Sequence, residues 1–146
     1  MERTMKTYLD INHMCKQMNK EKCLVLFRGT RYMYRFPIEK IVYIQTIPNE
    51  DWCSVVMAEP LKHLGNPIDI PMRLSQIVAE LQLQIDGYYN LVRCGRSTLI
   101  NISYIRQIDS FQSTIHLSDG INFFMLNVSR EACKEMMILM KNIFEA

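Results

Sequence analysis

The sequence predicts a mainly β domain with two α-helices, arranged along the chain as strands, helix, strands and helix. Short runs rich in Val, Ile, Leu, Tyr and Phe alternate with Gly, Pro, Asp and Ser, a composition typical of strands joined by turns. Two segments, 73–84 and 129–144, carry apolar residues at helical spacing instead. With 146 residues, of which 49% are hydrophobic, the chain is long enough to bury one core, so we expect one domain.

The first strands are expected in residues 23–47, where the text CLVLFRGTRYMYRFPIEKIVYIQTI predicts two or three of them. In the run RYMYRF, aromatic residues alternate with other types, which is typical of a half-buried strand with Tyr32, Tyr34 and Phe36 on one face. Proline donates no hydrogen bond to a sheet, so Pro37 is expected to mark a strand end or an edge.

The middle of the chain is expected to hold one strand, one irregular segment and one helix. A polar turn at 48–51 precedes the strand-like run WCSVVM. Residues 59–71 contain three prolines and a glycine, which predicts a loop or ribbon. After it, apolar residues recur every three or four positions and predict a helix of about three turns, with a stripe made of Leu74, Ile77, Val78 and Leu81.

Strands resume after this helix in the runs YYNLVRC, STLINIS, IRQIDSF, STIHLS and INFFML, which are separated by turn residues at Gly95, 109–110 and 118–120. Their regular spacing of about ten residues predicts an antiparallel meander. The last segment predicts a helix with Ser129 as its N-cap. Its apolar stripe is expected to fill the core and consists of Ala132, Met136, Leu139, Met140 and Ile143.

Residues 1–22 do not share this pattern and are expected to form an N-terminal extension to a domain that spans 23–146. The extension would suit an amphipathic helix that packs on the domain or on a second copy of the chain. One side of such a helix would carry Tyr8, Ile11, Met14, Cys15 and Met18.

The sequence makes no case for a membrane span, secretion, a metal site or catalysis. Its apolar runs are only strand-sized, and its N-terminus lacks the apolar core of a secretory signal. The five cysteines form no C-x-x-C pair, the three histidines fall in unrelated segments, and phosphate-binding and nucleophile motifs are absent. We therefore expect a cytoplasmic protein that is not an enzyme, needs no cofactor and does not insert into a membrane.

The most specific text is LVRCGRSTLINISYIRQID at 91–109, followed after a hairpin by LNVSRE at 126–131. It resembles the LytTR family of bacterial DNA-binding domains. The matching residues occur in the family's order and approximate spacing, and they are Arg93, Arg96, Ser97, Leu99, Asn101, Ile105, Ser129 and Arg130. Upstream, PIEKIVYIQT and RLSQIVAEL resemble the family's entry strand and first helix, so the resemblance covers about residues 24–143.

The resemblance implies an elongated arrangement of antiparallel sheets that binds double-stranded promoter DNA through loops, unlike a helix-turn-helix protein. In the family, loop side chains enter successive major grooves. Arg96 and Arg130 match the base-reading residues, and the turn from Asn49 to Trp52 matches the other contacting loop. The chemistry of arginine agrees with this role, because its planar guanidinium can bond both major-groove acceptors of guanine.

Four further residues are candidates for DNA contact. Ser97 would bond near the same surface as Arg96, and Lys134 lies one helical turn from Arg130, within reach of a phosphate. Arg93 is expected to point to the opposite sheet face from its neighbour Cys94. For Asn101, an inward amide that holds the loop is the interpretation we prefer to DNA contact.

For Arg130 the alternative is a solvent-exposed helix position or a salt bridge, and we favour DNA contact.

The sequence also departs from the family pattern. Gly95 replaces a frequent histidine, Thr98 a usual aromatic residue, and Glu131 a common basic residue. The carboxylate of Glu131 would weaken the attraction to phosphate. Many family members carry a receiver domain that controls dimerisation, and 22 residues are too few for one. We therefore expect a stand-alone domain controlled by its expression level, a regulatory protein partner or residues 1–22.

Two functions compete on this evidence. We favour a sequence-specific transcriptional regulator that binds a DNA repeat as two copies, because one small domain buries little DNA surface. The alternative is a protein-interaction module of the same fold that has lost specific DNA binding and uses exposed strand edges or the methionine-rich helix. The low net charge of +2 and Glu131 favour this alternative, whereas Arg96 and Arg130 favour DNA.

Overall fold

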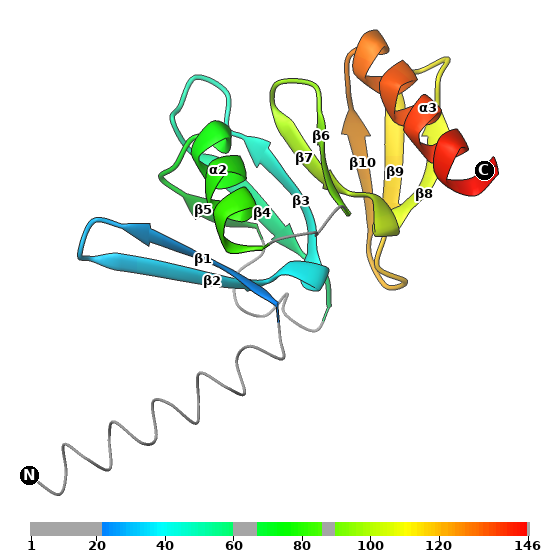
Figure 1. Cartoon of the computed structure of the whole chain (residues 1–146). Helices are drawn as coiled ribbons and strands as arrows, with labels where there is room; N and C mark the ends of the chain where they lie inside the picture. The colour runs from blue at the N-terminus through cyan, green and yellow to red at the C-terminus, as the bar shows by residue number, and fades with distance from the viewer. Residues whose placement is uncertain (1–21, 60–66, 86–89, 146) are drawn as a thin grey trace, which may run out of the picture.

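The structure is a computed structural model that describes residues 22–59, 67–85 and 90–145. As predicted, these residues form antiparallel strands and two α-helices (Figure 1). The elements in chain order are β1 (Cys23–Arg28), β2 (Tyr32–Pro37), the 3-10 helix η1 (Ile38–Lys40), β3 (Ile41–Thr46), β4 (Cys53–Met57), β5 (Ile68–Ile70), α2 (Leu74–Gln84), β6 (Leu91–Cys94), β7 (Thr98–Asn101), the 3-10 helix η3 (Ile102–Tyr104), β8 (Ile105–Asp109), β9 (Thr114–Ser118), β10 (Phe123–Asn127) and α3 (Arg130–Glu145).

The strands form three sheets that lie in a row, which gives the molecule its elongated shape (Figure 1). The central sheet has five strands in the order β5-β4-β3-β7-β6. Strands β8, β9 and β10 form a three-stranded sheet, and β1 and β2 form a separate hairpin. The text from 23 to 47 thus holds three strands, and β2 ends at Pro37 as expected.

One topological prediction was wrong. The five strands after α2 do not form one meander, because β6 and β7 join the central sheet through β3, and only β8 to β10 form a meander of their own. The cause is the burial of β7 on both faces, with Leu99 and Ile100 facing different hydrophobic cores. A strand buried on both faces is stable inside a sheet, so β7 pairs with β3 on one side and β6 on the other.

Two hydrophobic cores lie on opposite faces of the central sheet. The first is closed by α2 and the β1–β2 hairpin, and contains Ile44 and Leu99 of the sheet with Ile77 of the helix. The second is closed by α3 and the three-stranded sheet, and brings Ile100 against Leu117 and neighbouring side chains. The central sheet is therefore held from both sides, which fixes the turns at its ends.

The helices begin as the sequence indicates. In α3, Ala132 N donates to Ser129 Oγ (3.1 Å) and Cys133 N donates to Ser129 O (2.9 Å), which confirms Ser129 as the N-cap. In α2, Arg73 N donates to Gln76 Oε1 (3.0 Å). The expected amphipathic helix over 1–22 lies outside the described residues apart from Lys22. The predicted loop at 59–71 is described only at its ends, where Ile68–Ile70 form the short strand β5.

The turn between β9 and β10 is organised by one carboxylate. Asp119 Oδ1 accepts from Ile121 N (2.9 Å) and Asn122 N (2.6 Å), and Asp119 Oδ2 accepts from Glu59 N (3.0 Å), which follows β4. Burial raises the pKa of Asp119, but these hydrogen bonds outweigh burial and hold the pKa well below its usual range. The charged form of Asp119 therefore ties the three-stranded sheet to the central one.

Replacing Asp119 with alanine is expected to lower the free energy of unfolding at pH 7 by about 1–2 kcal/mol, because backbone N–H groups lose their acceptor. The folded-state pKa lies below the unfolded value, so this stabilisation is present above about pH 4 and is lost as the pH falls further. Urea unfolding of both proteins from pH 7 to pH 3 measures it. Asp119→Asn keeps one acceptor oxygen, so its free energy of unfolding should lie between those of the wild type and Asp119→Ala. Equal stability of the wild type and Asp119→Ala at pH 7 would contradict the assignment.

Candidate nucleic-acid interface

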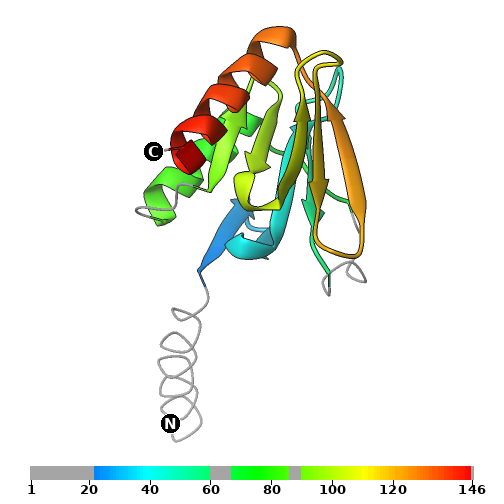
Figure 2. The ribbon, with the colours of Figure 1, turned by 90° about the vertical axis from the view of Figure 1, so that its right-hand side faces the viewer.

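Three segments far apart in the sequence meet at one end of the central sheet: the β3–β4 turn, the β6–β7 turn and the link from β10 to α3 (Figure 1). Strands β3 and β7 are antiparallel neighbours, so the end of β3 lies beside the start of β7, and Thr46 N donates to Ser97 O (2.8 Å). Figure 2 shows these turns at the same end of the molecule, with the β9–β10 turn at the other end.

The start of α3 packs directly on the β6–β7 turn. Gly95 adopts a φ of +70°, in the left-handed region that favours glycine, and a Cβ placed there would lie 3.5 Å from Ala132 Cβ. The Cys94 thiol lies 4.0 Å from Ala132 O. Burial raises the pKa of Cys94 to about 11, with smaller contributions from Cys133 and Glu135, so this thiol stays protonated and unreactive at neutral pH.

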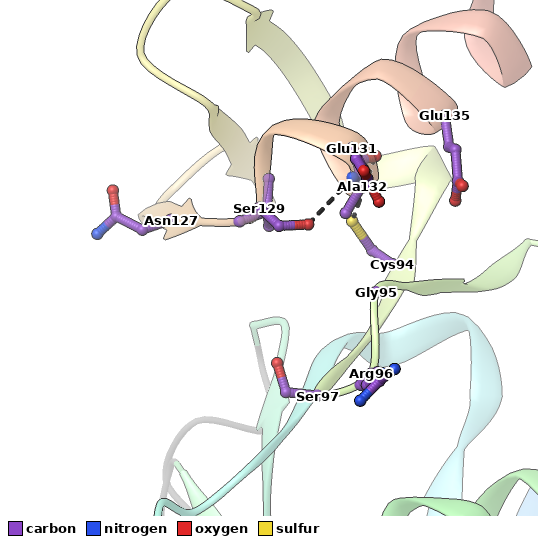
Figure 3. Close-up of a pocket in the computed structure, with 10 residues that line it drawn as sticks. Cys94, Gly95, Arg96, Ser97, Asn127, Ser129, Glu131, Ala132 and Glu135 are labelled. Atoms are coloured by element: carbon purple, nitrogen blue, oxygen red, sulfur yellow. Dashed lines mark hydrogen bonds between the residues drawn. The ribbon is translucent and has the colours of Figure 1, made fainter.

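A hollow of about 410 Å³ opens between the two segments (Figure 3). Arg96 and Ser97 lie on one side, and the residues that lead into α3 lie on the other (Figure 3). Its lining consists of Cys94, Gly95, Arg96, Ser97, Asn127, Val128, Ser129, Glu131, Ala132 and Glu135. The hollow therefore lies between two stretches of sequence, 93–97 and 127–131, that carry half of the predicted site residues.

Arg96 is exposed at the tip of the β6–β7 turn. Its main-chain oxygen accepts a hydrogen bond from Arg93 Nη2 (3.2 Å), so Arg93 braces the turn, and Arg93 is exposed while Cys94 is buried. Within the described part of the chain, the Arg96 guanidinium forms no salt bridge. Because Arg96 is exposed, its side chain is accessible from solvent.

The β3–β4 turn carries the other predicted contacts. Asn49 adopts a φ of +64°, a conformation that asparagine tolerates better than most residues, and Trp52 is 41% exposed. Ile47 N donates to Trp52 O (2.9 Å), which closes the turn. Asp51 forms a salt bridge with Arg73 (3.2 Å) just before α2, so this turn is tied to a second element.

The first turns of α3 carry charges of both signs. Glu131 and Glu135 are four residues apart on one face, and both line the hollow beside Arg96. Arg130 and Lys134 have the same spacing and are both exposed, but they do not line the hollow. Sequence reasoning weighed Glu131 as a departure but missed that Glu135 shares its face, which the spacing of four residues on a predicted helix could have indicated.

Asn101 does not reach the surface. It is fully buried, its Nδ2 donates to Ile41 O (2.9 Å), and its Oδ1 accepts from Ser103 N (3.1 Å) and Ser103 Oγ (2.6 Å). All these partners belong to the protein, so the side chain fixes η3 and the end of β7. The structure therefore separates Asn101 from the exposed candidates Arg93, Arg96 and Ser97, in agreement with the inward amide that we preferred.

The described residues hold no group of three or more His, Cys, Asp or Glu side chains placed to bind a metal ion. Neither α2 nor α3, the helices described here, is both long enough and apolar enough to cross a membrane. What the site offers is a set of exposed arginine, serine, asparagine and tryptophan side chains on rigid turns. Fold and site define a β-rich domain in which exposed turns and the start of a helix lie together at one end of the central sheet.

Comparison with known proteins identifies the family. A family model described as the LytTr DNA-binding domain matches residues 31–141, which is more than half of the chain. The chain therefore belongs to the LytTR family of DNA-binding domains, a family of DNA-binding modules and not of enzymes, as its motifs indicated. The fold is also similar to that of the LytTr DNA-binding domain of a protein described as a methyl-accepting/DNA response regulator from Bacillus cereus, with a TM-score of 0.51, 20% identity, and coverage of 82% of this chain and 96% of that one. Comparison with curated proteins gave no match.

If the hollow beside Arg96 faces DNA, replacing Glu131 with glutamine is expected to raise the affinity for DNA of any sequence about two- to five-fold at low salt, because one negative charge is removed from its lining. The same change should lower the free energy of unfolding by about 0.3–1 kcal/mol, since an acidic residue in the first turn of a helix is favourable. Fluorescence anisotropy with labelled duplexes and urea unfolding measure the two effects.

Glu145→Gln, at the other end of α3, is the matched control for the Glu131 substitution and should leave DNA affinity unchanged. The gain in affinity of Glu131→Gln should shrink as salt is added. A loss of affinity would mean that the carboxylate itself accepts a hydrogen bond from DNA.

Proposed function

We propose that this protein is a sequence-specific transcriptional regulator that binds promoter DNA through loop side chains in the major groove. The observation that carries the proposal is the exposed Arg96, held on a glycine turn directly beside the start of α3. Turns of this kind project their side chains from a rigid sheet, which reduces the entropy lost when DNA is bound.

The exposed residues divide by their chemistry into readers of bases and ligands of phosphate. Arg96 and Arg130 suit base reading, because a guanidinium bonds guanine O6 and N7 together. Lys134, Arg93 and Ser97 suit phosphate contacts that fix the register of the protein on the duplex. Asn101 supports the site from inside.

The β3–β4 turn suits a second contact with the duplex. Asn49 and Trp52 lie on a turn that Thr46 joins to the β6–β7 turn, so both turns face the same partner. Support for this placement comes from the exposed fraction of Trp52 and the closed geometry of its turn. An amide and an indole N–H are both able to donate to phosphate oxygens.

We further propose that two copies bind one DNA site, as a homodimer or on a repeat, and that the protein acts in the cytoplasm, where bacterial promoter DNA lies. A single domain of this size buries a limited DNA surface, and a repeat multiplies the specificity of the contacts. A regulatory protein partner would then act by blocking or stabilising the paired state.

Selection of bound duplexes from a random-sequence pool at near-physiological salt tests the proposal. We expect one enriched motif, and an affinity for it that falls steeply as salt rises, because phosphate contacts release counterions. A pool that stays random, with folded protein, would overturn the proposal. So would an affinity that does not depend on salt.

The alternative function, a protein-interaction module, is favoured by one set of observations. The β1–β2 hairpin lies away from the site end in both views (Figures 1 and 2). It exposes Phe27 and Met33, which are paired across the two strands. Residues 22–37 also carry four basic side chains and no acidic one. Retention of an acidic partner protein by the wild type, lost in Phe27→Ser and without any selected DNA motif, would establish this function instead.

A further inference from the structure

A fourth turn lies at the site end of the molecule, where the sequence predicts only a break between strands. The β8–β9 turn joins the link before α3, because Val128 N donates to Ser113 O (3.0 Å) and Val128 lines the hollow. Figures 1 and 2 both place this turn beside the start of α3. At its tip, Phe111 is 96% exposed and Gln112 is also exposed.

The turn is rigid although its tip is exposed. Asp109 Oδ1 accepts from both Phe111 N (3.0 Å) and Gln112 N (3.0 Å), and Ser113 adopts a φ of +55°. The Cys133 thiol lies 3.7 Å from Asp109 O and donates to it, so α3 holds the turn from a second side. A large apolar ring is thus presented to solvent on a fixed backbone, where it contributes nothing to the core.

The chemistry of the tip differs from that of the other turns. Residues 110–113 are Ser, Phe, Gln and Ser, so the tip carries no charge, and the Asp109 carboxylate is occupied by the backbone. Such a tip has no charge with which to attract phosphate over a distance. An apolar ring beside a primary amide instead matches the major-groove edge of an A·T pair, which presents the thymine methyl group, adenine N7 and the adenine amino group.

We propose that the β8–β9 turn reads an A·T base pair at one end of the DNA site, with Phe111 on the thymine methyl group and Gln112 on adenine N7 and N6. This inference rests on the proposed function and adds a fourth reading segment to it. The turn is the last in the row formed by the β3–β4 turn, the β6–β7 turn and the start of α3 (Figure 1). The pair that it reads therefore flanks the base read by Arg130.

The test changes one chemical group of a DNA base at a time. After selection with the wild-type protein, the thymine at the end of the motif is replaced by deoxyuridine, which lacks only the methyl group, and the adenine by 7-deazaadenine, which lacks the N7 acceptor. Deoxyuridine should weaken wild-type binding about four-fold, the value of one buried methyl group. The deaza base should weaken it about ten-fold, within the range for a bidentate contact.

Two protein variants are then measured on the same pairs of duplexes. Phe111→Ser should bind the thymine and deoxyuridine duplexes equally, and Gln112→Ala should bind the adenine and deazaadenine duplexes equally. Phe27→Ser is the matched control, because Phe27 is also exposed but lies on the hairpin away from the site end, and it should behave as the wild type. Both substituted turn residues are exposed, so circular dichroism should show an unchanged fold.

The outcomes separate the two proposals. A selected motif whose thymine and deoxyuridine forms bind the wild type equally would overturn the role of the β8–β9 turn and leave the proposed function intact. The role would also be overturned if Phe111→Ser weakened binding to the thymine and deoxyuridine duplexes by the same factor relative to the wild type. The ring would then contact the DNA backbone or a second protein and not the methyl group. A wild-type protein that selects no motif would overturn the proposed function and this inference together.

Discussion

Replacing Arg96 with alanine is expected to abolish the preference for guanine at one position of the DNA site and to weaken binding to the preferred duplex about 5- to 100-fold. Arg96 forms no salt bridge within the described residues, so the substitution breaks no ion pair in that part of the protein. Because the side chain is exposed, the free energy of unfolding should change by less than about 0.5 kcal/mol. Selection from a random pool and anisotropy titration with both proteins measure the two binding effects.

Two further substitutions of basic residues, Lys134→Ala and Arg28→Ala, are compared with Arg96→Ala to separate base reading from phosphate contact. Lys134→Ala should weaken binding to all sequences alike and lower the slope of affinity against salt by about one, as expected for a phosphate contact. Arg28→Ala, at the end of β1 in the hairpin, should change neither quantity. If Arg96→Ala selects the same motif as the wild type, Arg96 does not read a base, whatever the fate of the other contacts.

Replacing Asn101 with alanine is expected to lower the free energy of unfolding by about 3 kcal/mol, because Ile41 O loses a buried donor and Ser103 loses its acceptor. This is a large part of the stability of a small domain. The midpoint of urea unfolding measures it. DNA binding should be lost only to the extent that the protein unfolds.

Ser97→Ala is the control for the Asn101 substitution. Ser97 lies four residues away, is exposed, and should change stability by less than about 0.5 kcal/mol. An Asn101→Ala protein that unfolds at the wild-type urea concentration yet binds DNA poorly would show that the amide acts on DNA and not on the fold.

Much of the architecture could be predicted because local patterns determine it. The cap at Ser129 depends on one hydroxyl and its neighbours, and the helix that follows depends on apolar spacing within sixteen residues. The end of β2 at Pro37 depends on one missing donor. Each of these is a property of a short stretch of chain, which a linear reading contains in full.

The pairing of strands could not be predicted in the same way, and the complete burial of Asn101 depends on that pairing. The partner of β7 is β3, more than fifty residues earlier, and spacing between strands says nothing about such a choice. Asn101 sits in a motif whose neighbours Arg96 and Ser97 are exposed, and only the burial of both faces of β7 turns its amide inward. The acidic face of α3 beside Arg96 likewise depends on how the helix is rotated against the β6–β7 turn.

The distance in sequence between the segments of the site has a consequence for synthesis. Thr46 pairs with Ser97, and Gly95 contacts Ala132, so the site spans most of the described chain. A growing polypeptide on the ribosome that holds β1 to β7 has formed the first turns but has no α3 to complete the hollow. Contacts of such long range form late in folding. A nascent chain therefore completes the hollow only once residues 127–135 have emerged and packed. On the proposed function, a chain that still lacks these residues would bind DNA more weakly than the finished protein.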